Sequence, residues 1–157
     1  VLVFPVCTAN WKARVKVRTS NVNCEFNEQD SIFFHLDLKG EILNKPESVE
    51  HATVMLDALS GNTHSVISGV CLRSSQKELS FSVESKVQFA SLEREEIAHY
   101  IRKYEPMDQA GSYGIQEWLG LNKVQSIQGC YYNIMGLPCA RLYEELRGNF
   151  PEFIPAL

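Results

Sequence analysis

The segment YEPMDQAGSYGIQEWLG, residues 104–120, combines glycines with side chains that stack and form hydrogen bonds. Three glycines interrupt it: Gly111, Gly114 and Gly120. Glycine permits a positive φ or a close approach of the backbone to a ligand. The Gln116 amide both donates and accepts, which suits a nucleobase edge, while the rings of Tyr113 and Trp118 can stack on a base or pack in a core. The residues alone leave a ligand site and a tight structural turn equally open.

Two other segments carry groups that could bind an anion or transfer a proton. In NKP, residues 44–46, Lys45 precedes a helix-starting proline, so its ammonium group and the helix N-terminus could both face a phosphate. A solvated lysine before such a proline is the simpler interpretation of this tripeptide alone. In SGNTH, residues 60–64, the serine and glycine fit a helix C-terminus, and an isolated histidine such as His64 is more often structural than catalytic.

The composition narrows the class of protein. A chain of 157 residues, with 45% apolar and 22% charged residues, is expected to form one globular domain. Its net charge of −4 does not favour long nucleic acid as a partner. No apolar run is long enough to span a bilayer, and the opening VLVFPV lacks the basic flank of a signal peptide. The first residue is valine, which fits a fragment, a processed product or a wrongly assigned start.

The cysteines indicate a reduced, cytosolic protein. There are five, an odd number without a close pair, which argues against a disulfide framework and against a zinc knuckle. Cys130 and Cys139 have no base nearby in the sequence and are expected to be buried thiols. The sequence contains no Walker loop and no GxGxxG, GxSxG or HExxH motif.

Hydrophobic periodicity predicts an alternation of hairpins and helices. Helices are expected to begin at Pro46, after an N-cap at Ser91, and at Pro138. The expected strands are 1–6, 14–18, 31–38, 41–43, 63–72, 79–89 and 124–129. The pattern predicts the α/β class with a mixed β-sheet and flanking helices.

Four ordered motifs resemble the Maf family: GEILNKP, MLDALSGNTHSVISGVCL, EPMDQAGSYGIQEW and IQGCYYNIMGLPCARLYEEL. The resemblance covers residues 40–147, and residues 1–30 diverge. It implies a single domain over residues 1–157 with a Maf/ITPase-like fold and a cleft between two lobes. Members of the family are nucleoside triphosphate pyrophosphatases, also described as septum-formation inhibitors.

The resemblance also implies an activity. The family hydrolyses a nucleoside triphosphate between its α and β phosphates and requires a divalent metal, Mg²⁺ or Mn²⁺. Lys45 falls on the family's phosphate-binding lysine, and Gln116 falls on its base-specificity glutamine. The form GCYYNIMGLP resembles the branch that acts on dTTP and UTP. A cytoplasmic homodimer without a membrane or nucleic-acid partner is the implied state.

The N-terminal part departs from the family pattern. The family's SxSPRR loop, which grips the phosphates, is absent from residues 1–30. Its catalytic aspartate lies twelve residues before the lysine, and twelve residues before Lys45 stands Phe33. Gln109 occupies a position where the family usually has a lysine, so one positive charge is lost.

Three nearby residues are the candidates to replace the missing groups. The resemblance implies Asp30 as the general base, Ser31 as a substrate-binding residue and Glu25 as a metal ligand. If they do not fill these roles, the chain is expected to be a catalytically impaired nucleotide-binding or regulatory relative, or the product of a disrupted gene. The sequence leaves both hypotheses open.

Overall fold

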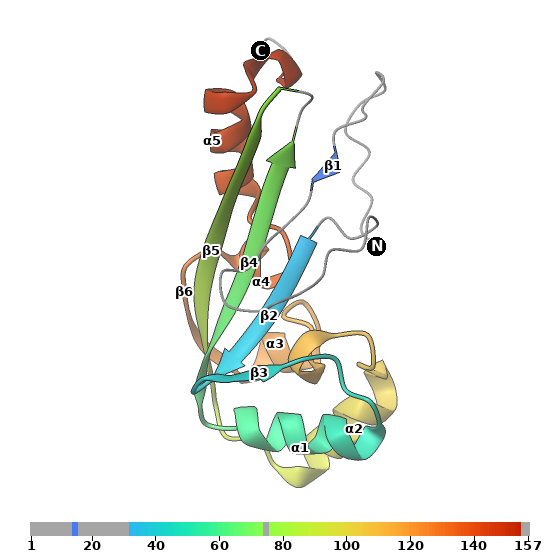
Figure 1. Cartoon of the computed structure of the whole chain (residues 1–157). Helices are drawn as coiled ribbons and strands as arrows, with labels where there is room; N and C mark the ends of the chain where they lie inside the picture. Colours follow the sequence, from blue (N-terminus) through green and yellow to red (C-terminus); the bar gives the residue numbers. More distant parts are fainter. Residues whose placement is uncertain (1–13, 16–31, 74–75, 155–157) are drawn as a thin grey trace.

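The computed structural model describes residues 14–15, 32–73 and 76–154. Within these residues, six strands form one sheet, with the order β3-β2-β4-β5-β6 and β1 paired to β4 (Figure 1). The strands are β1 (Arg14–Val15), β2 (Ile32–Leu38), β3 (Glu41–Leu43), β4 (Thr63–Arg73), β5 (Glu78–Phe89) and β6 (Val124–Gln128). Every pairing that these strands make is antiparallel. The long β4–β5 pair forms the centre of the sheet.

A tight turn joins β2 and β3. Leu38 pairs with Glu41, so only Lys39 and Gly40 form the turn, and both have a positive φ, of 56° and 90°. The backbone amide of Gly40 donates a hydrogen bond of 3.2 Å to the Asp37 side chain. The predicted hairpin is therefore confirmed.

The helices lie at the two ends of the sheet and against it. In Figure 1, α1 and α2 lie together at one end, and α5 lies beside β5 at the other. The helical elements are α1 (Val49–Leu59), α2 (Arg94–Tyr104), η1 (Ala110–Ser112), α3 (Trp118–Lys123), α4 (Tyr131–Ile134), α5 (Cys139–Asn149) and η2 (Pro151–Phe153). No helix in the described residues is long and apolar enough to cross a membrane.

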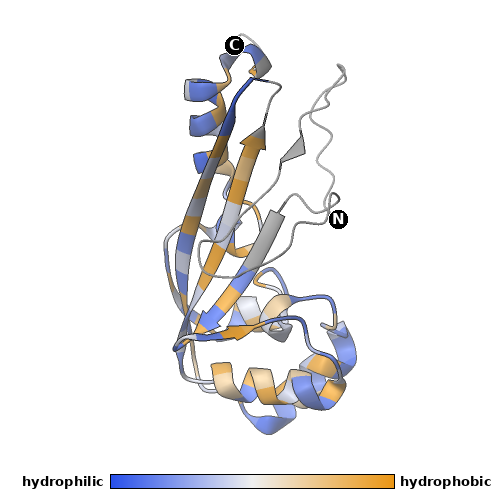
Figure 2. Cartoon of the chain, in the orientation of Figure 1, coloured by the Kyte–Doolittle hydropathy of each residue, from blue (hydrophilic) through white to orange (hydrophobic). Residues whose placement is uncertain are grey.

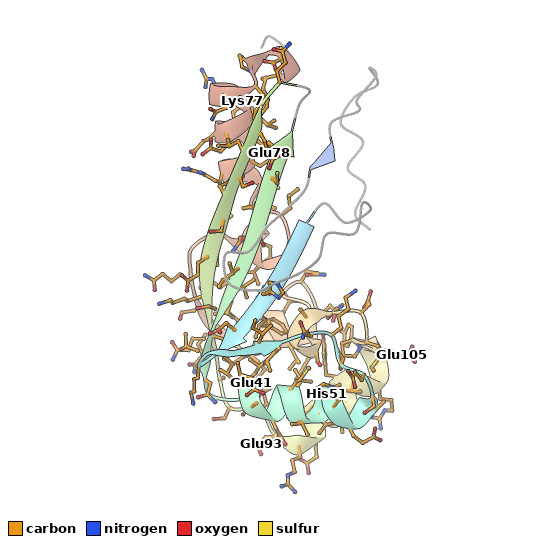
Figure 3. All side chains as sticks on the ribbon, viewed as in Figure 1. Glu41, His51, Lys77, Glu78, Glu93 and Glu105 are labelled. Carbon is orange, nitrogen blue, oxygen red and sulfur yellow. The ribbon has the colours of Figure 1, made fainter. Side chains whose placement is uncertain are left out.

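Capping side chains determine where α1 and α2 begin. Ser48 accepts a hydrogen bond from an amide in the first turn of α1, so the predicted start at Pro46 was wrong. Glu93 and Glu96 form a reciprocal capping box at the start of α2, so the N-cap is not Ser91 as predicted. Figure 3 labels Glu93, the N-cap residue. The predicted start of α5, directly after Pro138, is confirmed.

The buried apolar residues form two clusters. The larger cluster joins the lower part of the sheet to α1, α2 and the segment around η1, and its largest fully buried residues include Tyr100 and Phe89. The smaller cluster joins Val70 and Leu72 of β4 to Phe150 at the end of α5. Figure 2 shows apolar residues along β4, the strand that both clusters share.

The predicted α/β class, with a sheet and flanking helices, is confirmed, but the sheet was expected to be mixed and the described strands pair only antiparallel, in part because hairpins join β2 to β3 and β4 to β5. The expected strand 1–6 lies outside the described residues, and the expected cleft between two lobes stays a prediction. Cys130 and Cys139 are half-buried, so the prediction that both are fully buried thiols was wrong. Both stand where a short loop enters a helix, which leaves part of each side chain exposed.

Candidate functional site

The NKP segment and the glycine-rich segment meet in the structure. The backbone amide of Gly111 donates a 3.1 Å hydrogen bond to the carbonyl of Asn44, the residue before Lys45. Gly111 has φ of 67°, and a Cβ there would lie 2.5 Å from the Leu36 side chain. Glycine is therefore required on both counts. The contact places the exposed Lys45 beside the segment that carries Gln116.

The next two residues anchor the glycine-rich segment in the core. The Ser112 hydroxyl lies 3.2 Å from the Met55 sulfur in α1. The Tyr113 hydroxyl lies 2.7 Å from Nε2 of His64 in β4. The Tyr113 and Phe89 rings pack edge to face, with their centroids 4.9 Å apart. Of the two roles that the sequence left open for Tyr113, the structure therefore shows the core role.

His64 is a buried, neutral anchor for Tyr113. Its side chain is 2% exposed, and its ring stacks on that of Phe89 with the ring centroids 5.5 Å apart. Burial lowers the pKa of His64 to about 4, so the imidazole is neutral near pH 7. Nδ1 has no hydrogen-bond partner among the described residues, so protonation there would create a buried, unpaired charge.

We expect the stability of the protein to fall as the pH falls through the range in which unfolded histidine gains a proton. Because the folded-state pKa of about 4 lies below the ordinary histidine pKa of 6.5, the unfolded state binds more protons between these two values. The contribution of His64 is therefore present above about pH 6.5 and is lost toward pH 4. Urea unfolding should show a loss of about 2 kcal/mol between about pH 7.5 and pH 5 from this group.

The variant His64→Gln isolates this effect, because the other histidines remain in both proteins. The difference in unfolding free energy between the original chain and His64→Gln should shrink as the pH falls. An equal dependence on pH in both proteins would contradict the assignment to His64.

A cluster around Tyr100 holds the second half of the segment. The Tyr100 hydroxyl accepts a 3.1 Å hydrogen bond from the amide of Gly114 and donates one to Oε2 of Glu117. Nε2 of Gln109 donates a 2.7 Å bond to Oε1 of the same carboxylate. Burial and the neighbouring carboxylate raise the pKa of Tyr100, so its hydroxyl stays protonated and available as a donor.

The chain then folds back on itself at α3. Ile115 is 4% exposed and packs in the larger core cluster. A Cβ at Gly120 would overlap the carbonyl oxygen of Ile115. The third glycine of the motif thus allows α3 to pack directly against the backbone that precedes Gln116.

Gln116 differs from all its neighbours. Its side chain is exposed and makes no hydrogen bond with the described residues, whereas every residue from 111 to 115, and Glu117, is held by a contact named above. Trp118 is half-buried against the core, with its ring 6.3 Å from His99. The glycine-rich segment is therefore a tightly anchored turn that presents one free amide, Gln116.

The structure tests only part of the predicted site. Lys45 and Gln116 come from segments that touch, whereas Asp30, Ser31 and Glu25 lie outside the described residues. Between residues 32 and 73 and from 76 to 154, no group of three His, Cys, Asp or Glu side chains could hold a metal ion.

The strand position before the NKP segment is now defined. From Ile32 to Asp37, β2 pairs with β4 one residue against one, and the turn into β3 has two residues. No extra residue is accommodated in this stretch. Phe33 therefore keeps the position twelve residues before Lys45, opposite Gly69 of β4.

Sequence reasoning missed the role of Tyr100, Glu117 and Gln109. Of these three, only Gln109 was singled out from the sequence, as the residue at a position where the family usually has a lysine. The available signal was a glutamate directly after the exposed glutamine, within a segment of otherwise small or apolar residues.

Comparison with known proteins identifies the family. A family model described as Maf-like protein matches residues 7–149. A dTTP/UTP pyrophosphatase of Bacteroides thetaiotaomicron is 52% identical over 110 residues, which is 70% of this chain and 57% of that protein. A protein of the same name from Phocaeicola vulgatus is 54% identical over 110 residues, with the same coverage of 70% and 57%.

A more distant relative extends the match. The dTTP/UTP pyrophosphatase of Cytophaga hutchinsonii is 41% identical over 139 residues, which cover 86% of this chain and 63% of that protein. The aligned part of this chain thus spans little more than half of the length of these curated relatives. Because the family model matches most of the chain, the chain belongs to the Maf-like protein family.

Proposed function

We propose that this chain is, or is part of, a nucleoside triphosphate pyrophosphatase that acts on dTTP and UTP. The observation that carries the proposal is the glycine-rich turn, in which every neighbour of Gln116 is anchored and the Gln116 amide alone is free. The names of the relatives and their identity of 52% and 54% over 110 residues support the choice of substrate.

The chemistry assigns a role to each proposed residue. Lys45 neutralises oxygens of the triphosphate, and Ser31 binds the same group. Asp30 accepts a proton from a water molecule as the water oxygen attacks the α phosphorus. The bond between the α phosphorus and the oxygen that bridges to the β phosphorus then breaks, and pyrophosphate leaves with the bonding electrons. The nucleoside monophosphate remains with the oxygen from water.

A metal ion remains a separate part of the proposal. When bound, Mg²⁺ or Mn²⁺ would neutralise charge on the triphosphate, with Glu25 as one ligand. Glu25 lies outside the described residues, and within them no group of three His, Cys, Asp or Glu side chains could hold the ion. We also infer that the protein is cytoplasmic and forms a homodimer. Sedimentation of the purified chain would test whether it dimerises.

Gln116 suits the base of the proposed substrates. Uracil and thymine present an N–H donor beside a carbonyl acceptor, and one amide can pair with both. If the amide is flipped so that its oxygen and nitrogen exchange places, it can also pair with cytosine, which presents an acceptor beside a donor. Selectivity for uracil and thymine therefore depends on how firmly the structure sets the position and direction of Gln116.

A second candidate function has one observation in its favour. Phe33 stands twelve residues before Lys45, where the resemblance implies the family's catalytic aspartate, and from Ile32 to Asp37 β2 pairs with β4 without a bulge. This observation favours a nucleotide-binding protein with impaired catalysis. Such a protein would gain thermal stability on binding nucleotide but would release no pyrophosphate.

The two candidates are separated by one assay with two readouts. Pyrophosphate release is measured for dTTP, UTP, dCTP and GTP, first with Mg²⁺ and then with Mn²⁺, and the melting temperature is measured with each nucleotide. Release concentrated on dTTP and UTP supports the enzyme. A higher melting temperature without release supports the binding protein, and neither effect in a folded chain contradicts both.

A further inference from the structure

Both oxygens of the Glu117 carboxylate accept hydrogen bonds from uncharged donors. Its two oxygens accept hydrogen bonds from Tyr100 in α2 and from the Gln109 side chain, which comes from the loop before η1. No ion pair of Glu117 occurs among the described residues. A half-exposed glutamate would ordinarily be solvated, so two directed donors from separate elements indicate that its position matters to the site.

The same carboxylate lies against the backbone on the other side of Gln116. A Cβ at Gly114 would lie 2.8 Å from Cδ of Glu117, so the glutamate side chain covers Gly114. The amide of Gly114 in turn donates to the Tyr100 hydroxyl. One hydroxyl therefore binds both the residue two positions before Gln116 and the residue directly after it.

Glu117 also begins α3. It is the N-cap residue of that helix, and its carbonyl accepts a 2.9 Å hydrogen bond from the amide of Leu121. The amide of Glu117 donates a 3.0 Å bond to the carbonyl of Gly114, which closes a turn around Ile115 and Gln116. A shift of Glu117 would therefore move the Cα–Cβ direction of Gln116.

We propose that Glu117 is a positioning residue that sets base selectivity by holding Gln116, with Tyr100 and Gln109 as the groups that fix its carboxylate. This inference rests on the proposed function. Glu117 acts through Gln116, because both carboxylate oxygens already accept hydrogen bonds from protein groups. Loss of the carboxylate frees the turn around Gln116, and the amide then pairs less well with uracil or thymine and discriminates less against cytosine.

The test measures equilibrium binding, so that it does not depend on turnover. The probes are the α,β-methylene analogues of dTTP and dCTP. A methylene group replaces the oxygen that bridges their α and β phosphorus atoms, so this link cannot be hydrolysed. Titration calorimetry is run on the original chain and on Glu117→Ala, Glu117→Gln and Gln109→Ala, below the melting temperature of each. Glu84→Ala is the control, because Glu84 also accepts a hydroxyl bond, of 2.7 Å from Ser65, but lies exposed on β5.

We expect Glu117→Ala to weaken binding of the dTTP analogue by about tenfold or more, which matches the loss of a charge-assisted hydrogen bond. The ratio of the dTTP-analogue affinity to the dCTP-analogue affinity should also fall, by a smaller factor, because binding of the cytosine analogue weakens less. Glu117→Gln should restore most of the affinity, and Gln109→Ala should have a smaller effect in the same direction. Glu84→Ala should bind like the original chain.

The outcomes distinguish this inference from the proposed function. If the original chain binds neither analogue, the proposed nucleotide site is wrong and the inference fails with it. If the original chain binds and Glu117→Ala, Gln109→Ala and Glu117→Gln all bind equally well, the inference alone is wrong. A lower melting temperature with unchanged affinity and selectivity would show that the cluster stabilises the fold without positioning Gln116. Should Glu117→Ala fail to fold, Gln109→Ala decides, because Gln109 is half-buried and supplies only one of the two donors.

Discussion

Gly120→Ala is expected to destabilise the protein by about 3 kcal/mol or more, because the new methyl group enters a packed interior. A Cβ at this position would overlap the carbonyl oxygen of Ile115, which belongs to the backbone and cannot rotate away as a side chain can. For a domain of this size, the loss corresponds to a melting temperature lower by roughly 6–12 °C. Calorimetry measures it directly.

A matched glycine provides the control. Gly148 lies in α5, and a Cβ there would meet no atom within 4 Å. Gly148→Ala should therefore leave the fold intact and raise the stability by up to about 1 kcal/mol, because alanine favours the helix. If both variants changed the melting temperature equally, the close packing of α3 on Ile115 would be wrong.

Asp30→Asn is expected to reduce kcat for dTTP hydrolysis by about 10²–10⁴-fold if Asp30 is the proposed general base, because asparagine cannot accept the proton of the attacking water. Lys45→Ala should lower kcat/KM as well, through the loss of a positive charge at the triphosphate. Initial rates of pyrophosphate release over a range of dTTP concentrations separate the two effects.

The control for these substitutions is a carboxylate outside the proposed site. Asp57 is exposed on α1, and Asp57→Asn should keep the kinetics of the original chain. If Asp30→Asn turned over dTTP at the original rate, Asp30 would not be the base.

Elements with a strong period could be predicted from the sequence. In β5, the alternation of Ser85, Val87 and Phe89 with polar residues predicts one buried face, and all three are buried. The inner positions Ile97 and Tyr100 of α2 are likewise buried, at 1% and 0% exposure. These elements are long enough for their patterns to exceed chance, and burial of one face then stabilises them.

The two shortest α-helices could not be predicted. The helix α3 has six residues with a glycine inside, and α4 has four residues, so neither shows a helical period. Val49 has the helical spacing of the buried residues of α1 but is 55% exposed, because it is the first residue of α1 and lies beyond the core. In these cases tertiary contacts, rather than local propensity, determine the structure.

The candidate site could be predicted only where single residues carry it. Gln116 and Lys45 were identified from their motifs, but the anchoring of Gln116 depends on packing between distant parts of the chain. Tyr100 and Glu117 are seventeen residues apart and meet only after α2 and the glycine-rich turn have packed together. No local pattern encodes such a contact.

The products formed from dTTP test the central claim most directly. The purified chain is incubated with dTTP and a divalent cation, and the nucleotide and phosphate products are separated and quantified. If the chain is the proposed pyrophosphatase, we expect dTMP and pyrophosphate in equal amounts, because the bond between the α phosphorus and the bridging oxygen is the one that breaks. Formation of dTDP and inorganic phosphate, or no product from a chain shown to be folded, would contradict it.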